Sequence, residues 1–231
     1  MHVLDNPAWH ALTGPHATVA ERVGSAARYE PDVSVFAALP DHITPAAWDD
    51  LRELIGPGGA AFIARPQLEV GDGWTVHFER PCRQMWQPHL PRPVEAAGDA
   101  SPLARATLGA GDVAEMLALV ARTEPGPFVQ RTIELGSYLG IRDAGALIAM
   151  AGERMHPPGF TEISAVCTDS AYRGRGLASE LATGIAAGIR ARAEVPFLHL
   201  TLENEPALRV YSALGFETRG FLDVVGVRAP R

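Results

Sequence analysis

The segment that decides the fold covers residues 160–193 and has the sequence FTEISAVCTDSAYRGRGLASELATGIAAGIRARA. Its first part, 160–168, is rich in β-forming residues and predicts a strand. Its last part, 176–193, predicts an amphipathic helix. The apolar face of that helix is marked by Leu177, Leu181, Ile185 and Ile189. The turn between them contains Gly174 and Gly176. Because glycines let an anion approach the backbone and a helix begins with unpaired N–H groups, this arrangement predicts a phosphate-binding loop.

Two common nucleotide-binding patterns are absent from this loop. The dinucleotide pattern Gly-x-Gly-x-x-Gly requires a third glycine where the chain has Ser179. The Walker pattern requires a lysine, and all 20 basic residues are arginine. The loop therefore indicates a phosphate ligand other than a nucleoside triphosphate.

A second informative segment follows at residues 204–216, NEPALRVYSALGF. Asn204 is a suitable N-cap, Pro206 falls in the first turn, and Gly215 is suited to end a helix. The segment therefore predicts a short helix over 206–214 that carries Tyr211.

Together the two segments resemble the GNAT N-acetyltransferase superfamily. Arg173-x-x-Gly176-x-Ala178 is similar to its Arg/Gln-x-x-Gly-x-Gly/Ala pattern, and 204–216 fills its Asn-x-x-Ala-x-x-x-Tyr-x-x-x-Gly-Phe pattern. The resemblance covers 103–227. It implies an α/β (α+β) fold with a mixed, mostly antiparallel sheet flanked by helices. It also implies transfer of an acetyl group from acetyl-coenzyme A to a primary amine of a small molecule, amino acid or peptide, without a metal.

The resemblance also implies which residues hold the coenzyme. The backbone of Val166, Cys167 and Thr168 is expected to pair with the pantetheine arm like an added strand, and Asn204 to contact the same arm or simply to cap its helix. Cys167 itself is expected to be a buried small hydrophobic residue. The pyrophosphate is expected on the loop formed by Arg173, Gly174, Arg175, Gly176, Leu177, Ala178 and Ser179. Arg175 either reaches a phosphate or is an exposed arginine between glycines.

Two residues are candidates for proton transfer. In the family, the tyrosine that matches Tyr211 protonates the departing thiolate, although a core tyrosine with a satisfied hydroxyl is the plain alternative. Glu162 stands at the offset from Arg173 at which the histone-acetylating branch has its general base. A raised pKa would suit Glu162 to that role. A solvated glutamate on a strand, with water as the base, is equally compatible with the sequence.

The remaining elements suggest two parts. Residues 44–56 predict a helix and 60–64 and 74–78 predict strands, which gives an N-terminal α+β region, 1–100, of unknown role; a degenerate GNAT-like half is one option. A proline-rich stretch, 87–102, predicts an extended linker or a long crossing loop. The acetyltransferase domain is expected over 101–231. Its other predicted helices are 112–122 and 128–139, and its other predicted strands are 146–155, 197–202 and 216 onwards.

Composition narrows the functional classes. A net charge of −7 argues against non-specific nucleic-acid binding. Two cysteines, Cys82 and Cys167, with no signal peptide and no membrane-spanning stretch, suggest a reduced cytoplasmic protein. The absence of lysine suggests a GC-rich bacterial genome. A homodimer, a longer acyl donor, a non-catalytic acyl-coenzyme A sensor and an interaction module in the N-terminal part remain open alternatives.

Overall fold

The computed structural model describes residues 1–89 and 103–231, so most of the predicted linker lies outside the described residues. The described part forms one sheet of eight strands and one of three. In spatial order, the large sheet consists of β4 (Ala60–Arg65), β11 (Glu217–Arg228), β5 (Thr75–Trp86), β10 (Val195–Thr201), β9 (Phe160–Thr168), β8 (Ala146–Glu153), β7 (Tyr138–Asp143) and β6 (Ala104–Leu108). The small sheet consists of β1 (Ala20–Val23), β2 (Ala26–Tyr29) and β3 (Ala37–Ala38). In the large sheet only β9 and β10 pair in parallel, which confirms the predicted, mostly antiparallel sheet.

The α-helices are α1 (Pro7–Leu12), α2 (Pro45–Ile55), α3 (Val113–Thr123), α4 (Leu177–Ala191) and α5 (Glu205–Ala213). Among the described residues, α2, α3, α4 and α5 begin and end close to where the sequence predicts, whereas α1 was not predicted. The 3-10 helices are η1 (Val3–Asp5), η2 (Ala17–Val19), η3 (Ala110–Asp112), η4 (Thr132–Leu135) and η5 (Ser170–Tyr172). Thr44 caps α2 by accepting a hydrogen bond from the N–H of Ala47, and Gly56 ends that helix with φ of 80°. None of the described helices has the length and hydropathy needed to cross a membrane.

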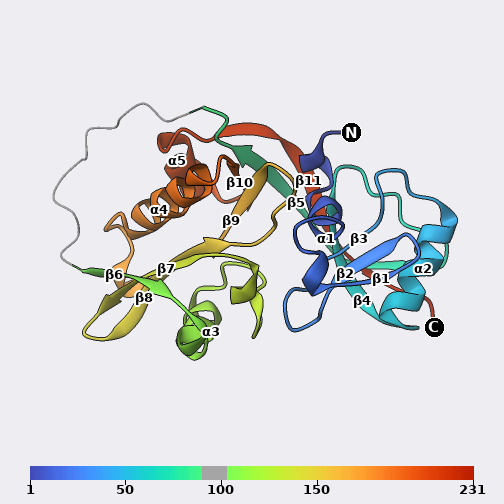
Figure 1. Ribbon diagram of the computed structural model, residues 1–231, viewed down its shortest axis with the longest axis horizontal. Coiled ribbons are helices and arrows are strands. Elements are labelled where there is room, and N and C mark those ends of the chain that lie inside the picture. The colour runs from blue at the N-terminus through green and yellow to red at the C-terminus, as the bar shows by residue number, and fades with distance from the viewer. Residues whose placement is uncertain (90–102) are drawn as a thin grey trace.

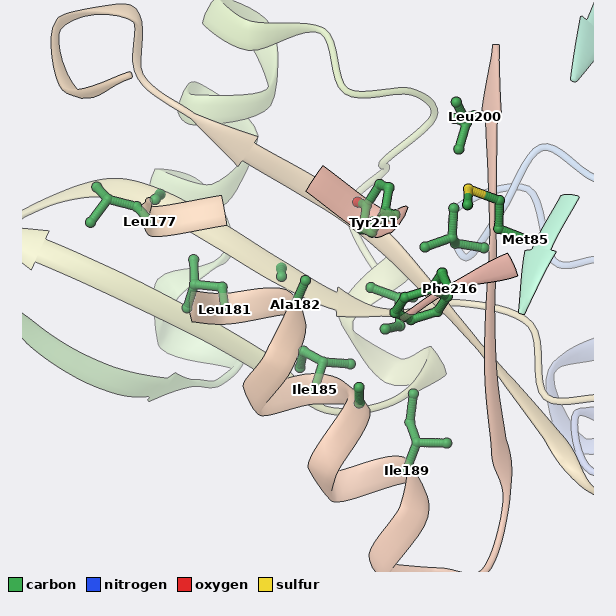
Figure 2. Packing of buried hydrophobic residues seen from close by; sticks show 14 of the residues in the cluster. Met85, Leu177, Leu181, Ala182, Ile185, Ile189, Leu200, Tyr211 and Phe216 are labelled. Carbon is green, nitrogen blue, oxygen red and sulfur yellow. The ribbon is translucent and has the colours of Figure 1, made fainter. Parts of the chain in front are cut away.

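The helices cover both faces of the large sheet. Figure 1 shows α4 and α5 on one side of β9 and α3 on the other, with α1, α2 and the small sheet gathered at the opposite end of the molecule. The apolar face predicted for α4 packs into a buried cluster with Met85, Leu200, Tyr211 and Phe216, and Figure 2 shows these side chains together. A separate cluster lies under α3. The amphipathic patterns of α3 and α4 therefore determine which side of each helix faces the sheet.

Strand β5 lies inside the large sheet, between β10 and β11. Trp86 pairs with Phe197 of β10, and Cys82 pairs with Leu222 of β11. Because β4 and β5 precede the boundary expected near residue 100, the sheet itself crosses that boundary. The division into two domains stays a prediction.

The helix expected over 128–139 is wrong. The segment contains only η4 before β7 begins at Tyr138. The N–H of Arg131 donates to the carbonyl of Asp32, at 2.8 Å, and the hydroxyl of Thr132 donates to the carbonyl of Val33, also at 2.8 Å. Hydrogen bonds to the N-terminal part thus replace the bonds that a longer helix would make within itself.

Candidate active site

The parallel strands β9 and β10 separate after a short paired stretch. Their pairing ends where Phe197 meets Glu162, although β9 continues to Thr168 and β10 to Thr201. Beyond this point β10 pairs with β5, and the edge of β9 that faces β10 has no strand partner among the described residues. A strand edge without a partner presents N–H and C=O groups to an extended ligand.

A β-bulge lies on the same part of β9. The register with β8 shifts between Met150 and Gly152, and Ala165 has φ of 53°. A non-glycine residue in this left-handed region is uncommon, and such conformations concentrate at functional sites. Because a bulge bends its strand, it contributes to the separation of β9 from β10.

The residues predicted to pair with the pantetheine arm lie beyond the bulge. Val166 packs against the α4 cluster, whereas Cys167 is buried in the α3 cluster. Burial raises the pKa of the Cys167 thiol, which disfavours the thiolate that a nucleophile requires. The hydroxyl oxygen of Thr168 is buried and has no hydrogen-bond partner in the described part of the chain. An unpaired polar atom of this kind is typical of a ligand site.

The predicted anion loop connects β9 to α4. Gly174 and Gly176 both have φ of 78°, and an added Cβ at either position would meet no atom within 4 Å. None of the backbone N–H groups of residues 174–179 donates to an acceptor in the described residues. Residues 173–176 are exposed, and Leu177 is buried as the first residue of α4. The loop therefore offers a series of free donors at the positive end of the α4 dipole.

The two arginines of the loop differ in their surroundings. The Nε of Arg173 lies 3.4 Å from the carbonyl oxygen of Thr168. Arg175 is exposed, and its guanidinium carbon lies 4.8 Å from the centre of the Tyr172 ring. Arg175 is thus both exposed and available to a phosphate, so the two alternatives left open by the sequence are compatible.

Tyr211 lies on α5 and faces the same buried cluster as Val166 and Leu177. Its ring contacts Phe216 edge to face, with 5.7 Å between ring centres. Burial raises its pKa, so the phenol carries its proton throughout the usual pH range. No described residue hydrogen-bonds to its hydroxyl, and the residue is 8% exposed. The role of Tyr211 as proton donor stays a prediction.

Asn204 caps α5 as its sequence position predicts. Its side-chain oxygen accepts a hydrogen bond from the N–H of Ala207 at 3.1 Å, and the residue is exposed. The contact with a pantetheine arm stays a prediction.

The raised pKa that would suit Glu162 to the role of general base is not found. Its carboxylate has no exposed surface and accepts hydrogen bonds from Nε and Nη2 of Arg154, at 2.8 and 2.6 Å, and from His199 at 2.7 Å. Burial alone would raise the pKa, but the charge and hydrogen bonds of Arg154 and the contact with His199 outweigh it and hold the pKa well below its ordinary 4.5. A buried carboxylate with both oxygens occupied is a poor proton acceptor.

The hydrogen-bond network around Glu162 was not predicted from the sequence. The amide of Gln84 is oriented by two partners, since its nitrogen donates to the carbonyl of Leu4 and its oxygen accepts from Arg219, both at 2.8 Å. The same nitrogen lies 2.8 Å from Nε2 of His199, which must accept, so the imidazole proton is on Nδ1 and points at Glu162. The pairing of β8 with β9 brings Arg154 beside Glu162, where the N–H of Arg154 donates to the carbonyl of Glu162. No local sequence pattern predicts this contact.

The described residues contain no group of three or more histidine, cysteine, aspartate or glutamate side chains arranged to hold a metal. By contrast, the free edge of β9, the hydroxyl of Thr168 and the donors of 174–179 suit an extended ligand with a phosphate at one end. Coenzyme A has this form, and these residues fit it.

Comparisons with known proteins support the same assignment. Residues 138–223 match the family model of FR47-like proteins. The chain is 33% identical over 104 residues to the N-alpha-acetyltransferase RimI of Mycobacterium tuberculosis, and the match spans 42% of this chain and 65% of that relative. A solved structure from Kribbella flavida, a GCN5-related N-acetyltransferase, shares the fold with a TM-score of 0.66 at 18% identity, covering 96% of this chain and 94% of that one.

The likeness extends over the whole chain in one further comparison. A solved structure from Novosphingobium aromaticivorans, assigned to the GNAT family of acetyltransferases, is 37% identical, with a TM-score of 0.87 and complete coverage of both chains. The similarity therefore includes the N-terminal part as well as the segments that carry the motifs. The chain belongs to the GNAT family of acetyltransferases.

Proposed function

We propose that the protein transfers an acetyl group from acetyl-coenzyme A to a primary amine. The observation that carries this proposal is the combination of an unpaired β9 edge with an adjoining loop whose N–H groups at 174–179 lack acceptors. The edge suits the amide-rich pantetheine arm, and the loop suits the pyrophosphate. Family membership supports the same donor.

The residues of the chain have distinct roles in this reaction. The backbone of Val166, Cys167 and Thr168 holds the pantetheine arm, and an N–H on this edge polarises the thioester carbonyl. The amine nitrogen attacks that carbonyl, the carbon–nitrogen bond forms, and the carbon–sulfur bond breaks. Tyr211 gives its proton to the departing sulfur. Water accepts the proton that the amine loses and passes a proton back to the tyrosine, which restores the phenol. Because the carboxylate of Glu162 is buried in an ion pair with Arg154, water rather than Glu162 is the proposed base.

The acceptor is proposed to be a primary amine of a small molecule, an amino acid or a peptide. The α-amino group of a peptide is included because the Mycobacterium tuberculosis relative is an N-alpha-acetyltransferase. We propose that the segments 122–128 and 156–159 border the acceptor. The first is largely exposed, whereas the second contacts the N-terminal part, since the rings of His156 and His16 lie 4.8 Å apart. The N-terminal part is therefore proposed to cover one side of the acceptor site.

The test combines binding with turnover. Calorimetry with purified full-length protein should show coenzyme A binding, and a panel of amines, amino acids and peptides with acetyl-coenzyme A should release free thiol. Absence of coenzyme A binding at millimolar concentration would refute the proposal. Tight binding without turnover on any amine would favour an acyl-coenzyme A sensor instead, and faster thiol release from a longer thioester would identify a different acyl donor.

A further inference from the structure

The side chain of Arg175 is exposed yet held in place. Its guanidinium lies over the ring of Tyr172, 4.8 Å from the ring centre, and it belongs to no ion pair in the described part of the chain. Arg175 also stands between Gly174 and Gly176, whose N–H groups are among the free donors of the loop. An uncompensated cation therefore accompanies the backbone donors.

Tyr172 is itself fixed at both ends. Its hydroxyl donates to Oδ2 of Asp143 at 2.7 Å, and its ring packs against the buried cluster beneath α4. Asp143 ends β7, so the support comes from the rigid sheet rather than from the loop. The neighbouring Arg142 pairs with Asp112 and Glu115, which leaves the Asp143 carboxylate to the tyrosine.

We propose that Asp143 and Tyr172 are positioning residues that hold the guanidinium of Arg175 ready to bind a phosphate of coenzyme A. This inference rests on the proposed function and adds a preoriented side chain to the backbone donors of the loop. A long arginine side chain loses conformational freedom when it binds, and stacking on a fixed ring removes part of that freedom beforehand. Cation–π contact and the aspartate-bound hydroxyl thus contribute to affinity without touching the ligand.

A double-mutant cycle separates this role from a merely structural one. Calorimetry would measure the Kd for coenzyme A in Arg175→Gln, Tyr172→Leu and the double variant. We expect a loss on the order of tenfold for Arg175→Gln, which corresponds to one charged hydrogen bond. For Tyr172→Leu we expect a loss of about two- to fivefold, as for an exposed cation–π contact. In the double variant Tyr172→Leu should add no further loss, because Tyr172 acts only through Arg175.

Two further variants and two kinetic readouts make the test specific. Tyr172→Phe and Asp143→Asn keep the ring and should cost less affinity than Tyr172→Leu. In Tyr172→Leu and Arg175→Gln, the KM for acetyl-coenzyme A should rise while the turnover rate at saturating acetyl-coenzyme A stays unchanged. The loss of coenzyme A affinity in Arg175→Gln should be smaller at high salt. Arg80→Gln is the matched control, because Arg80 also stacks on an aromatic ring, 5.1 Å above Phe78, but lies on β5.

Dephospho-coenzyme A distinguishes the two sources of phosphate. If the penalty of Arg175→Gln disappears with this analogue, Arg175 binds the ribose 3′-phosphate; if it persists, Arg175 binds the pyrophosphate. Additive losses in the cycle, or unchanged affinity in Arg175→Gln, would overturn the inference while leaving the proposed function intact. Failure of the wild-type protein to bind coenzyme A would instead refute the proposed function.

Discussion

Arg154 donates two hydrogen bonds to the carboxylate of Glu162, at 2.8 and 2.6 Å, in a place where Glu162 has no exposed surface. The guanidinium of Arg154 also lies over the ring of Phe36, which belongs to the N-terminal part. Glu162, a candidate general base from the sequence, is therefore part of a buried connection between the two parts of the chain.

Replacing Glu162 by glutamine should mainly lower stability. The change leaves the charge of Arg154 buried without its partner, and the expected loss in the free energy of unfolding is about 3–5 kcal/mol. Denaturant titration measures it, with Glu217→Gln, on an exposed position of β11, as the control. A variant as stable as the wild type but with a much lower turnover rate would restore Glu162 as the general base.

Tyr211→Phe should lower the turnover rate by about tenfold or more while leaving the affinity for coenzyme A nearly unchanged, because the proton is needed only as the sulfur departs. Calorimetry and thiol release measure the two quantities. Tyr138→Phe is the control, since the hydroxyl of Tyr138 donates to the carbonyl of Glu153 at 2.8 Å, away from the loop. That variant should lose about 1 kcal/mol of stability and keep its turnover rate. A large loss of coenzyme affinity in Tyr211→Phe would mean that the residue is structural.

Gly176→Asp should abolish coenzyme A binding, because it places a negative charge beside the free N–H groups of the loop. The matched control is Gly159→Asp, since Gly159 has φ of 80° and equally open surroundings but lies in the β8–β9 turn. Both variants carry similar backbone strain, so a comparison of their Kd values isolates the effect on the site. Equal affinities in the two variants would contradict the loop assignment.

Lowering the pH below 6.5 should destabilise the protein through His16. The ring of His16 is buried with its centre 4.8 Å from that of His156, and burial lowers the pKa of His16 to about 4. Because the unfolded state binds this proton more readily than the folded state, the contribution of neutral His16 to the free energy of unfolding is fully present above pH 6.5. It is lost progressively as the pH drops towards 4. Thermal unfolding of His16→Gln should show a flatter dependence over this range, whereas His42→Gln, an exposed position, should behave like the wild type.

Residues 103–231 alone should fail to form a soluble acetyltransferase. Without the N-terminal part, this fragment lacks β5, which lies between β10 and β11 in the full sheet. It also exposes Phe197 and Leu222, which in the full chain are buried in one cluster with Leu4. Expression and size-exclusion chromatography of this fragment, beside the full chain, check the expectation. A soluble, active fragment would show that the second part is autonomous.

Local patterns were sufficient for the elements that carry the motifs. The four-residue spacing from Leu177 to Ile189, the Asn204 cap and the β-rich run of 160–168 depend on neighbouring residues, and the structure confirms all three elements. The outcome differs for 128–139, where Arg131 and Thr132 bond to residues about a hundred positions earlier. Sequence periodicity does not report such a distant partner.

The same reason explains the mixed result at the site. The free N–H groups of the loop follow from two glycines and a helix start, so the sequence predicted an anion site there. The ionisation of Glu162, by contrast, depends on Arg154, which directly follows β8, and on His199 of β10. The support of Arg175 by Tyr172 and Asp143 likewise depends on how a hairpin turn lies beside the loop.

The central place of β5 also has a consequence for biosynthesis. Its partners, β10 and β11, are made more than a hundred residues later, so at ribosomal speed β5 waits on the order of ten seconds with both edges open. Glu79, Arg80, Pro81 and Arg83 lie along this strand, and charges and proline are the residues that discourage pairing with other chains. The large sheet can form only after β11 has been translated, which predicts slow folding governed by long-range contacts.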